Sequence, residues 1–285
     1  MVASLNRQYK AFMSVFNKDA IKRLVKDIKY LKKNPLNDNN IYYHHNMDNI
    51  FEGYAMIIGN PDTVYRNGLY FFKFVFPTNY PYEPPKVYFH TRYNDIRFHP
   101  NFYRNGKVCL SILNTWPGEK WSSCQSIHSV LLTIASSFNE TPLENEPYIH
   151  SENSKENYNE IYNTILKYAN LKYCFCELIQ TNKYTDNIVL QPFICFEDEI
   201  HQHFRDKIDD VLSIVQEESE KNSKIQQLSF SVYRYMEIKI NYPSLLTYIQ
   251  KIKKKMENAT IHTNNNKNIN QKTHQVPKTV ITSSE

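Results

Sequence analysis

Cys109 is the residue whose chemistry stands out first, because a cysteine thiolate can attack a carbonyl carbon and carry an acyl group as a thioester. A side-chain amide lies nearby along the chain at Asn101. An amide N–H near the sulfur can donate to the oxyanion that forms in such a transfer, or hold the loop that does so. A lone cysteine is more often a small buried apolar residue, so the catalytic interpretation depends on the residues around Cys109.

The other cysteines favour the structural interpretation. Cys174 and Cys176 are too close together for the usual zinc-binding pair, and no second pair of ligands accompanies them. Five cysteines without regular spacing argue against a disulfide framework and indicate a reducing compartment. We therefore expect no metal site and a cytoplasmic or nuclear location, which would be the host cytoplasm if the chain is viral.

Composition excludes further classes. The chain has 285 residues, 41% of them hydrophobic, which suffices for one mid-sized domain with appended structure. No apolar run is long enough to span a membrane, and residues 1–20 lack the pattern of a secretory signal. The net charge of +5 is modest, and the basic run at 251–255 sits in a helical pattern that favours a solvated helix face. Neither a membrane nor a nucleic acid is an expected partner.

Periodicity predicts the elements that must position Cys109. Apolar residues at helical spacing predict helices over residues 19–31, 126–138 and 158–169. Aromatic and β-branched runs bounded by turn residues predict short strands over residues 41–44, 50–58, 69–76 and 86–90. Such strands form an antiparallel meander. Residues 91–125 show little periodicity but are too apolar for disorder, so this long loop is predicted to be functional.

Beyond residue 182 the chain is predicted to be helical. Apolar stripes recur at helical spacing over 200–215 and 245–256. From residue 258 onward no aromatic residue occurs and Asn, Thr and Lys dominate, which is typical of a flexible tail. The expected organisation is an N-terminal segment, a catalytic domain, a helical extension and a tail, at residues 1–18, 19–180, 181–256 and 257–285.

The surroundings of Cys109 contain a combination of motifs. His99-Pro100-Asn101 precedes Cys109 by the separation at which ubiquitin-conjugating enzymes place their His-Pro-Asn triplet and nucleophilic cysteine. Residues 80–87, YPYEPPKV, and the pair Trp121-Ser122 resemble two more landmarks of that family, in the same order. The resemblance covers roughly residues 19–180. It implies an α+β ubiquitin-conjugating fold with an N-terminal helix, a four-stranded antiparallel meander, a long active-site loop and C-terminal helices, here with an extra helical extension.

Residues 101–113, NFYRNGKVCLSIL, and 145–147, NEP, are similar to the Z-type branch of this family. That branch accepts ubiquitin or a related modifier from a dedicated activating enzyme and has an extended C-terminal region. The resemblance implies that Cys109 carries ubiquitin, or a ubiquitin-like protein, as a thioester and passes it to a protein substrate or a ligase. No metal or organic cofactor is implied, because the activating enzyme consumes the ATP.

The same resemblance assigns supporting roles. His99 and Pro100 are expected to shape the turn that orients the Asn, rather than to transfer protons. Ser111 stands where other members often have an acidic residue that helps the acceptor lysine. Acidic help could come instead from Glu146 or Glu144, in the loop after the second main helix. By its order along the chain Glu146 matches the family's acidic residue near the active site, and an ordinary solvated carboxylate is the alternative.

Partner surfaces are implied in the same way. Arg23 and Lys26 match basic first-helix positions that meet the activating enzyme, although a solvated helix face also explains these charges. Two loops that usually dock ligases depart from the family pattern, with Tyr82 in place of phenylalanine and Ser122-Ser123-Cys124 in place of Ser-Pro-Ala.

Two other functions compete with catalysis. An inactive variant of the fold could bind ubiquitin or a ligase without chemistry, but such variants lack the cysteine, whereas this chain has both Cys109 and Asn101. The C-terminal helices could also serve as a scaffold that recruits a partner, and this role is compatible with catalysis.

Overall fold

The computed structural model describes most of the chain, with only the backbone described at residues 179–180 and 259–272. The described ranges are residues 18–93, 96–146, 158–180, 190–233 and 236–272. Within these ranges no helix is both long and apolar enough to cross a bilayer.

A four-stranded antiparallel sheet forms the centre of the N-terminal half. Its strands follow the chain in the order β1-β2-β3-β4, with bounds Ile41–His45, Glu52–Ile58, Leu69–Val75 and Lys86–Phe89. Each strand lies within two residues of its predicted bounds, so the predicted meander is confirmed. Tyr70, Phe72 and Phe89 are buried in the core together with Phe138, which follows the helix packed on the sheet.

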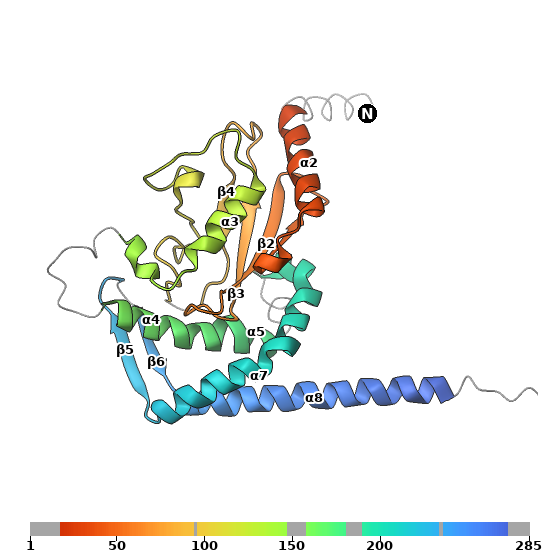
Figure 1. The fold of residues 1–285 in the computed structure, drawn as a ribbon, viewed down its shortest axis with the longest axis vertical. Helices are drawn as coiled ribbons and strands as arrows, with labels where there is room; N and C mark the ends of the chain where they lie inside the picture. Colours follow the sequence, from red (N-terminus) through yellow and green to blue (C-terminus); the bar gives the residue numbers. More distant parts are fainter. Residues whose placement is uncertain (1–17, 94–95, 147–157, 181–189, 234–235, 273–285) are drawn as a thin grey trace, which may run out of the picture.

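Two helices flank this sheet. Helix α2 (Lys18–Lys33) lies at its edge near β1, and helix α3 (Ile127–Ser137) lies across it (Figure 1). Ser126 caps α3 in a reciprocal capping box with Ser129, which fixes where the long loop ends. Val130, Leu131 and Ile134 of α3 are buried, as their helical spacing requires.

Helix α4 (Tyr158–Ala169) continues through a π-helical segment (Asn170–Cys176) into α5 (Glu177–Gln180). Asn170, in the π-helical segment, accepts a hydrogen bond from the buried Tyr70 hydroxyl at 2.6 Å and donates to the Arg66 carbonyl at 2.8 Å. The helices after α3 are therefore tied directly to the sheet.

The predicted helical extension is present, but it also contains a pair of strands that the sequence analysis did not predict. Between helix α7 (Glu197–Lys221) and helix α8 (Tyr242–Lys272), the chain forms a hairpin of β5 (Gln226–Phe230) and β6 (Met236–Ile240). In β6 the buried Met236, Ile238 and Ile240 alternate with exposed charged residues. This period of two is the strand signal, and the neighbouring helical stripes obscured it.

Helix α8 also continues to Lys272, past residue 256, where the extension was predicted to end. Residues 257–272 contain neither glycine nor proline, so no residue of that segment interrupts the helical backbone, despite its polar composition.

The extension packs against the N-terminal half and alongside α4 (Figure 1). Asp210 of α7 accepts hydrogen bonds from Arg66, at 2.6 and 3.1 Å, and from the Asn67 side chain at 2.6 Å. The His203 ring of α7 bonds to the Asn67 carbonyl at 2.9 Å. These polar contacts, between residues more than 130 positions apart in sequence, fix α7 on the loop between β2 and β3.

Candidate functional site

Cys109 and Asn101 are joined by two reciprocal hydrogen bonds. The Cys109 N–H donates to the Asn101 carbonyl at 2.9 Å, and the Asn101 side-chain amide donates to the Cys109 carbonyl at 2.8 Å. Both residues are buried. The residues from Asn101 to Cys109 therefore form a closed loop, and this loop holds the Cys109 thiol beside the Asn101 amide.

The turn of this loop requires glycine. Gly106 has φ +90°, a conformation that other residues rarely adopt, and its N–H donates to the Tyr103 carbonyl at 2.8 Å. A Cβ at this position would lie 3.0 Å from the Phe89 carbonyl oxygen. Gly106 thus allows the loop to fold back closely against the end of β4.

Thr115 is a residue of the site that sequence reasoning missed. Its hydroxyl donates to the Val108 carbonyl at 3.0 Å and accepts from the Leu110 N–H at 3.0 Å, so it fixes the backbone on both sides of Cys109. Thr115 belongs to no motif, and its only signal in the sequence is a hydroxyl in an otherwise apolar loop. Ser111 begins a 3-10 helix (Ser111–Leu113) and lies close to Gly118, where a Cβ would be 3.1 Å from that of Ser111.

His99 is a buried, neutral residue. Its Nδ1 accepts the Asn101 N–H at 3.0 Å, and its ring lies 4.6 Å from the Phe102 ring. Burial lowers the pKa of His99 to about 3, so the imidazole carries no charge near neutral pH. The Pro100 carbonyl accepts a hydrogen bond from Arg97. Both residues of the triplet that precede Asn101 thus lie in the local hydrogen-bond network of the turn.

This burial predicts a stability that depends on pH. In the unfolded chain the imidazole is protonated below its ordinary pKa of 6.5, whereas the buried ring stays neutral until about pH 3. Acid therefore stabilises the unfolded chain, and the free energy of unfolding should fall between these limits by up to about 1.4 kcal/mol per pH unit from this group. Urea titrations of the wild type and of His99→Asn, which retains an acceptor for the Asn101 N–H, measure it.

The expected result is a shallower fall in stability in the variant than in the wild type from pH 6 to pH 4. His45 and His203, whose pKa values burial also lowers, are present in both proteins and cancel in the comparison. Equal slopes in the two proteins would show that His99 is protonated in the folded state as readily as in the unfolded one.

Tyr103 lies beside Cys109 and belongs to a cluster of aromatic and charged side chains. Burial, followed by the charge and hydrogen bond of the Cys109 thiol, raises the pKa of Tyr103. The Arg97 guanidinium lies 4.2 Å from the centre of the Tyr103 ring and 4.4 Å from that of Tyr233. Glu146, the predicted acidic residue, accepts a hydrogen bond from the Tyr233 hydroxyl at 2.9 Å. Sequence reasoning identified neither Arg97 nor Tyr103 nor Tyr233.

Arg23 is bound within the protein. Its guanidinium pairs with Asp27 at 2.9 Å and donates to the carbonyls of Ser123, at 2.5 Å, and Gln125. Asp27 in turn accepts from the Tyr80 hydroxyl at 2.5 Å. Arg23 therefore joins α2 to the loop before α3, so its charge is engaged by groups of this chain.

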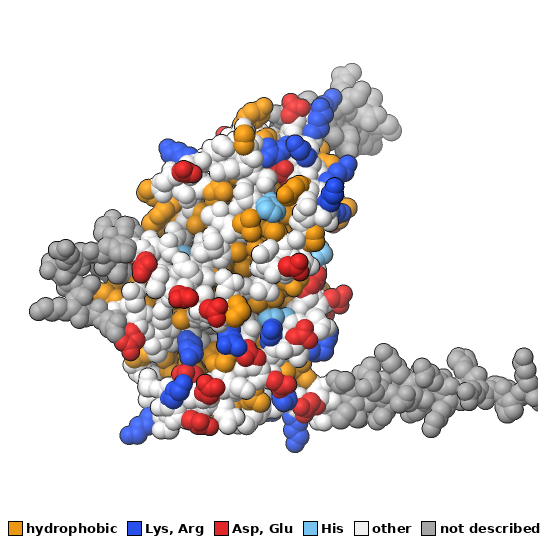
Figure 2. Space-filling model, viewed as in Figure 1, with side chains coloured by type: hydrophobic (Ala, Val, Ile, Leu, Met, Phe, Trp, Pro, Cys, Tyr) orange, Lys and Arg blue, Asp and Glu red, His pale blue; other side chains and the backbone are white. Residues whose placement is uncertain are grey.

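Lys26, by contrast, is exposed on α2, and basic side chains gather along this helix (Figure 2). The two predicted ligase loops lie together, because the Trp121 indole donates to the Pro81 carbonyl at 2.7 Å. Tyr82 is 70% exposed, and Ser122, Ser123 and Cys124 are also exposed. The structure thus brings the ligase-loop residues to one surface.

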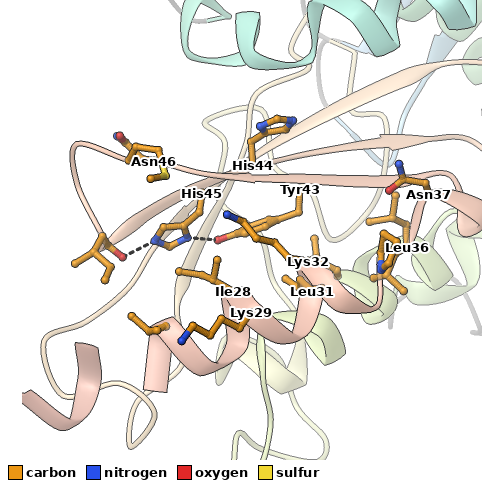
Figure 3. Close-up of a pocket in the computed structure, with 16 residues that line it drawn as sticks. Ile28, Lys29, Leu31, Lys32, Leu36, Asn37, Tyr43, His44, His45 and Asn46 are labelled. Atoms are coloured by element: carbon orange, nitrogen blue, oxygen red, sulfur yellow. Dashed lines mark hydrogen bonds between the residues drawn. The ribbon is translucent and has the colours of Figure 1, made fainter. Parts of the chain in front are cut away.

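An apolar groove of about 660 Å³ lies between α2 and β1 (Figure 3). Ile28 and Leu31 of α2 line it opposite Tyr43 and His45 of β1, whose side chains bond to each other at 2.8 Å. None of its lining residues belongs to the loop that holds Cys109. In the described part of the chain, no group of three or more His, Cys, Asp or Glu is arranged to hold a metal ion.

The fold and this loop agree with comparisons to known proteins. The family model described as ubiquitin-conjugating enzyme matches residues 23–166, half of the chain, so the chain belongs to the ubiquitin-conjugating enzyme family. The α+β fold predicted from the motifs is confirmed, with its N-terminal helix, meander, active-site loop and C-terminal helices.

Relatives of the Z type are among the similar proteins. The chain is 44% identical over 132 residues to ubiquitin-conjugating enzyme E2 Z of Xenopus tropicalis, covering 45% of this chain and 41% of that protein. The identity to the Homo sapiens E2 Z is 44% over 131 residues, 45% of this chain and 36% of that protein. A probable ubiquitin-conjugating enzyme of Caenorhabditis elegans is 37% identical over 174 residues, 57% of this chain and 24% of that protein. The match thus spans less than half the length of each of these relatives, and the predicted resemblance to the Z-type branch is confirmed.

Proposed function

We propose that this protein is a ubiquitin-conjugating enzyme that carries ubiquitin, or a ubiquitin-like protein, on Cys109. The reciprocal hydrogen bonds between Cys109 and Asn101 carry the proposal, because they fix a nucleophile and an amide in one closed loop. The named relatives are ubiquitin-conjugating enzymes, and this supports a catalytic role over a binding module without chemistry.

The proposed reaction has two acyl transfers. In the first, the Cys109 thiolate attacks the carbonyl carbon of the modifier's thioester on the activating enzyme, whose own thiolate leaves. In the second, the neutral amine of a substrate lysine, or the thiolate of a ligase cysteine, attacks the Cys109 thioester and the Cys109 thiolate leaves. An attacking amine also gives up one proton, to the leaving thiolate or to solvent, as the amide forms. The modifier ends on the lysine through an isopeptide bond or on the ligase as a thioester, and neither step needs an oxidant.

The side chains around Cys109 have distinct roles in this proposal. Asn101 holds the Cys109 carbonyl, so its first role is to shape the loop. The neutral His99 orients Asn101 by accepting its N–H, which fits a role in shaping the turn better than proton transfer. Ser111 places no acidic group after the cysteine, so Glu146 is the carboxylate proposed to receive the acceptor lysine.

Partners are proposed from surface chemistry. The exposed Lys26 and its basic neighbours on α2 would attract an acidic surface of the activating enzyme, whereas Arg23 would act by holding α2 in place. A ligase would dock on the surface of Tyr82 and Ser122 to Cys124. We further propose a cytoplasmic or nuclear location, since the proposed thioester chemistry needs Cys109 reduced.

A charging assay tests the function. The full chain is incubated with ATP, ubiquitin and a panel of activating enzymes, and the products are separated on non-reducing and reducing gels. The expected result is an adduct of the two proteins that a thiol reductant removes. If a folded protein gives no adduct with any activating enzyme, and none when other ubiquitin-like proteins are supplied, the conjugating function is wrong.

A further inference from the structure

Tyr233, at the turn of the C-terminal hairpin, brings the extension into contact with the active-site loop. Tyr233, which follows β5, is buried and donates its hydroxyl proton to Glu146 at 2.9 Å. Its ring lies against Arg97, whose guanidinium also covers the ring of Tyr103. Tyr103 interacts with the Cys109 thiol. One residue of the extension thus contacts Glu146 directly and is linked through Arg97 to Tyr103, which lies beside the Cys109 thiol.

Tyr233 is itself packed between the hairpin of the extension and α4. Its ring lies 5.5 Å from that of Phe230 and 5.8 Å from that of Tyr162 in α4. Phe230 pairs with Met236 across the hairpin and packs on Tyr158 as well. Because aromatic rings at these separations pack as in a protein core, the hairpin presents the Tyr233 hydroxyl from a defined position.

The hydroxyl has the chemistry that this position requires. Burial is the main cause that raises the pKa of Tyr233, so the phenol stays protonated and can donate to a carboxylate at any physiological pH. A carboxylate that accepts this hydrogen bond through one oxygen retains its second oxygen for a cation. Hydrogen bonds to a charged group are also stronger than those between neutral groups, so this contact restricts the orientation of Glu146.

A cavity of about 400 Å³ lies between the hairpin and the active-site loop, lined by Arg97, Tyr103, Arg104, Asn105, Val232 and Tyr233. From the hydrogen bond between Tyr233 and Glu146, and from the aromatic packing that holds Tyr233, we propose that Tyr233 is a positioning residue that orients the Glu146 carboxylate for the incoming lysine. The inference rests on the proposed function. It gives the C-terminal extension a part in the second transfer step and none in the first.

Two acceptors of different charge test this role. Wild type and Tyr233→Phe are charged with the modifier, the charging is stopped, and discharge is followed with free lysine and with hydroxylamine. Lysine arrives as a cation that must lose a proton, whereas hydroxylamine is uncharged at neutral pH and does not need a carboxylate. The variant should charge at the wild-type rate, discharge to lysine roughly tenfold more slowly, and discharge to hydroxylamine at the wild-type rate.

Matched variants separate positioning from folding. Tyr242→Phe removes the hydroxyl of another buried tyrosine of the extension, one that packs on Tyr168 away from Cys109, and should leave both discharge rates unchanged. Glu146→Gln should slow lysine discharge at least as much as Tyr233→Phe, and the double variant should be no slower than Glu146→Gln alone, because both changes act through one carboxylate.

The outcomes distinguish a failure of the proposed conjugating function from a failure of the proposed role of Tyr233. If the wild type cannot be charged with any modifier, the proposed function fails, and the role of Tyr233 fails with it. Normal charging with unchanged lysine discharge in Tyr233→Phe would overturn the positioning role alone. An equal fall with lysine and hydroxylamine would also overturn it, because a damaged loop slows every acceptor alike.

Discussion

Cys109→Ala is expected to abolish the reductant-sensitive adduct with the modifier completely, because alanine has no group that can accept the acyl chain. Cys109→Ser should give an adduct of the same size that survives reductant, since an oxygen ester is not cleaved by thiols. Both variants replace a small buried side chain by another of similar size, so the loop around residue 109 should remain folded. The non-reducing and reducing gels of the charging assay measure both results.

The matched control is Cys124→Ala. Cys124 is exposed, so of the cysteines that the structure describes it is the most accessible competitor for an adventitious thioester. Cys124→Ala should charge as the wild type does. An adduct that persists in Cys109→Ala and disappears in Cys124→Ala would show that Cys124, and not Cys109, carries the modifier.

Asn101→Ala is expected to slow transfer from the charged protein on the order of a hundredfold. The amide bonds to the Cys109 carbonyl at 2.8 Å in a buried site, so its removal leaves that carbonyl without its donor. Loss of such a buried partner should also lower the free energy of unfolding by about 1–3 kcal/mol. Single-turnover discharge to lysine and urea titration measure the two effects on the same samples.

Asn105→Ala is the control for this change. Asn105 lies in the same loop but is exposed, and its side chain only accepts the Lys107 N–H at 3.0 Å. It should alter neither stability nor transfer appreciably. A transfer defect in Asn101→Ala without loss of stability would show that the amide acts on the oxyanion directly rather than by holding the loop, and normal transfer would remove Asn101 from the mechanism.

Much of the fold could be predicted because its signals are local. In the meander strands apolar residues alternate or cluster over a few positions. In the helices they recur every three or four residues, so that they fall on the one face that is buried. The hairpin of the extension shows the limit of this reasoning. Its period-two pattern is short and lies between two helices with stronger periodicity, so the helical interpretation prevailed there.

In the candidate site, too, contacts between residues close in sequence could be predicted, whereas contacts between distant residues could not. Cys109 and Asn101 are paired by hydrogen bonds within a single loop. The number of residues between them is therefore visible in the sequence, and it could be used to predict the pairing. Glu146 could be proposed from its place in the order of motifs, but its partner Tyr233 is 87 positions away and belongs to no motif. Arg23 could be identified as basic, yet its carbonyl partners lie about a hundred positions further along the chain.

The sequence by itself determined the family and the meander and singled out Cys109 as the proposed nucleophile, because each depends on residues close together in the chain. Only the tertiary structure decided that Arg23 is engaged within the protein and that Tyr233 reaches Glu146. The physical reason is that a hydrogen bond depends on where two groups meet in space. Periodicity records only which faces of an element are buried, and it carries no information about which distant residue will lie opposite.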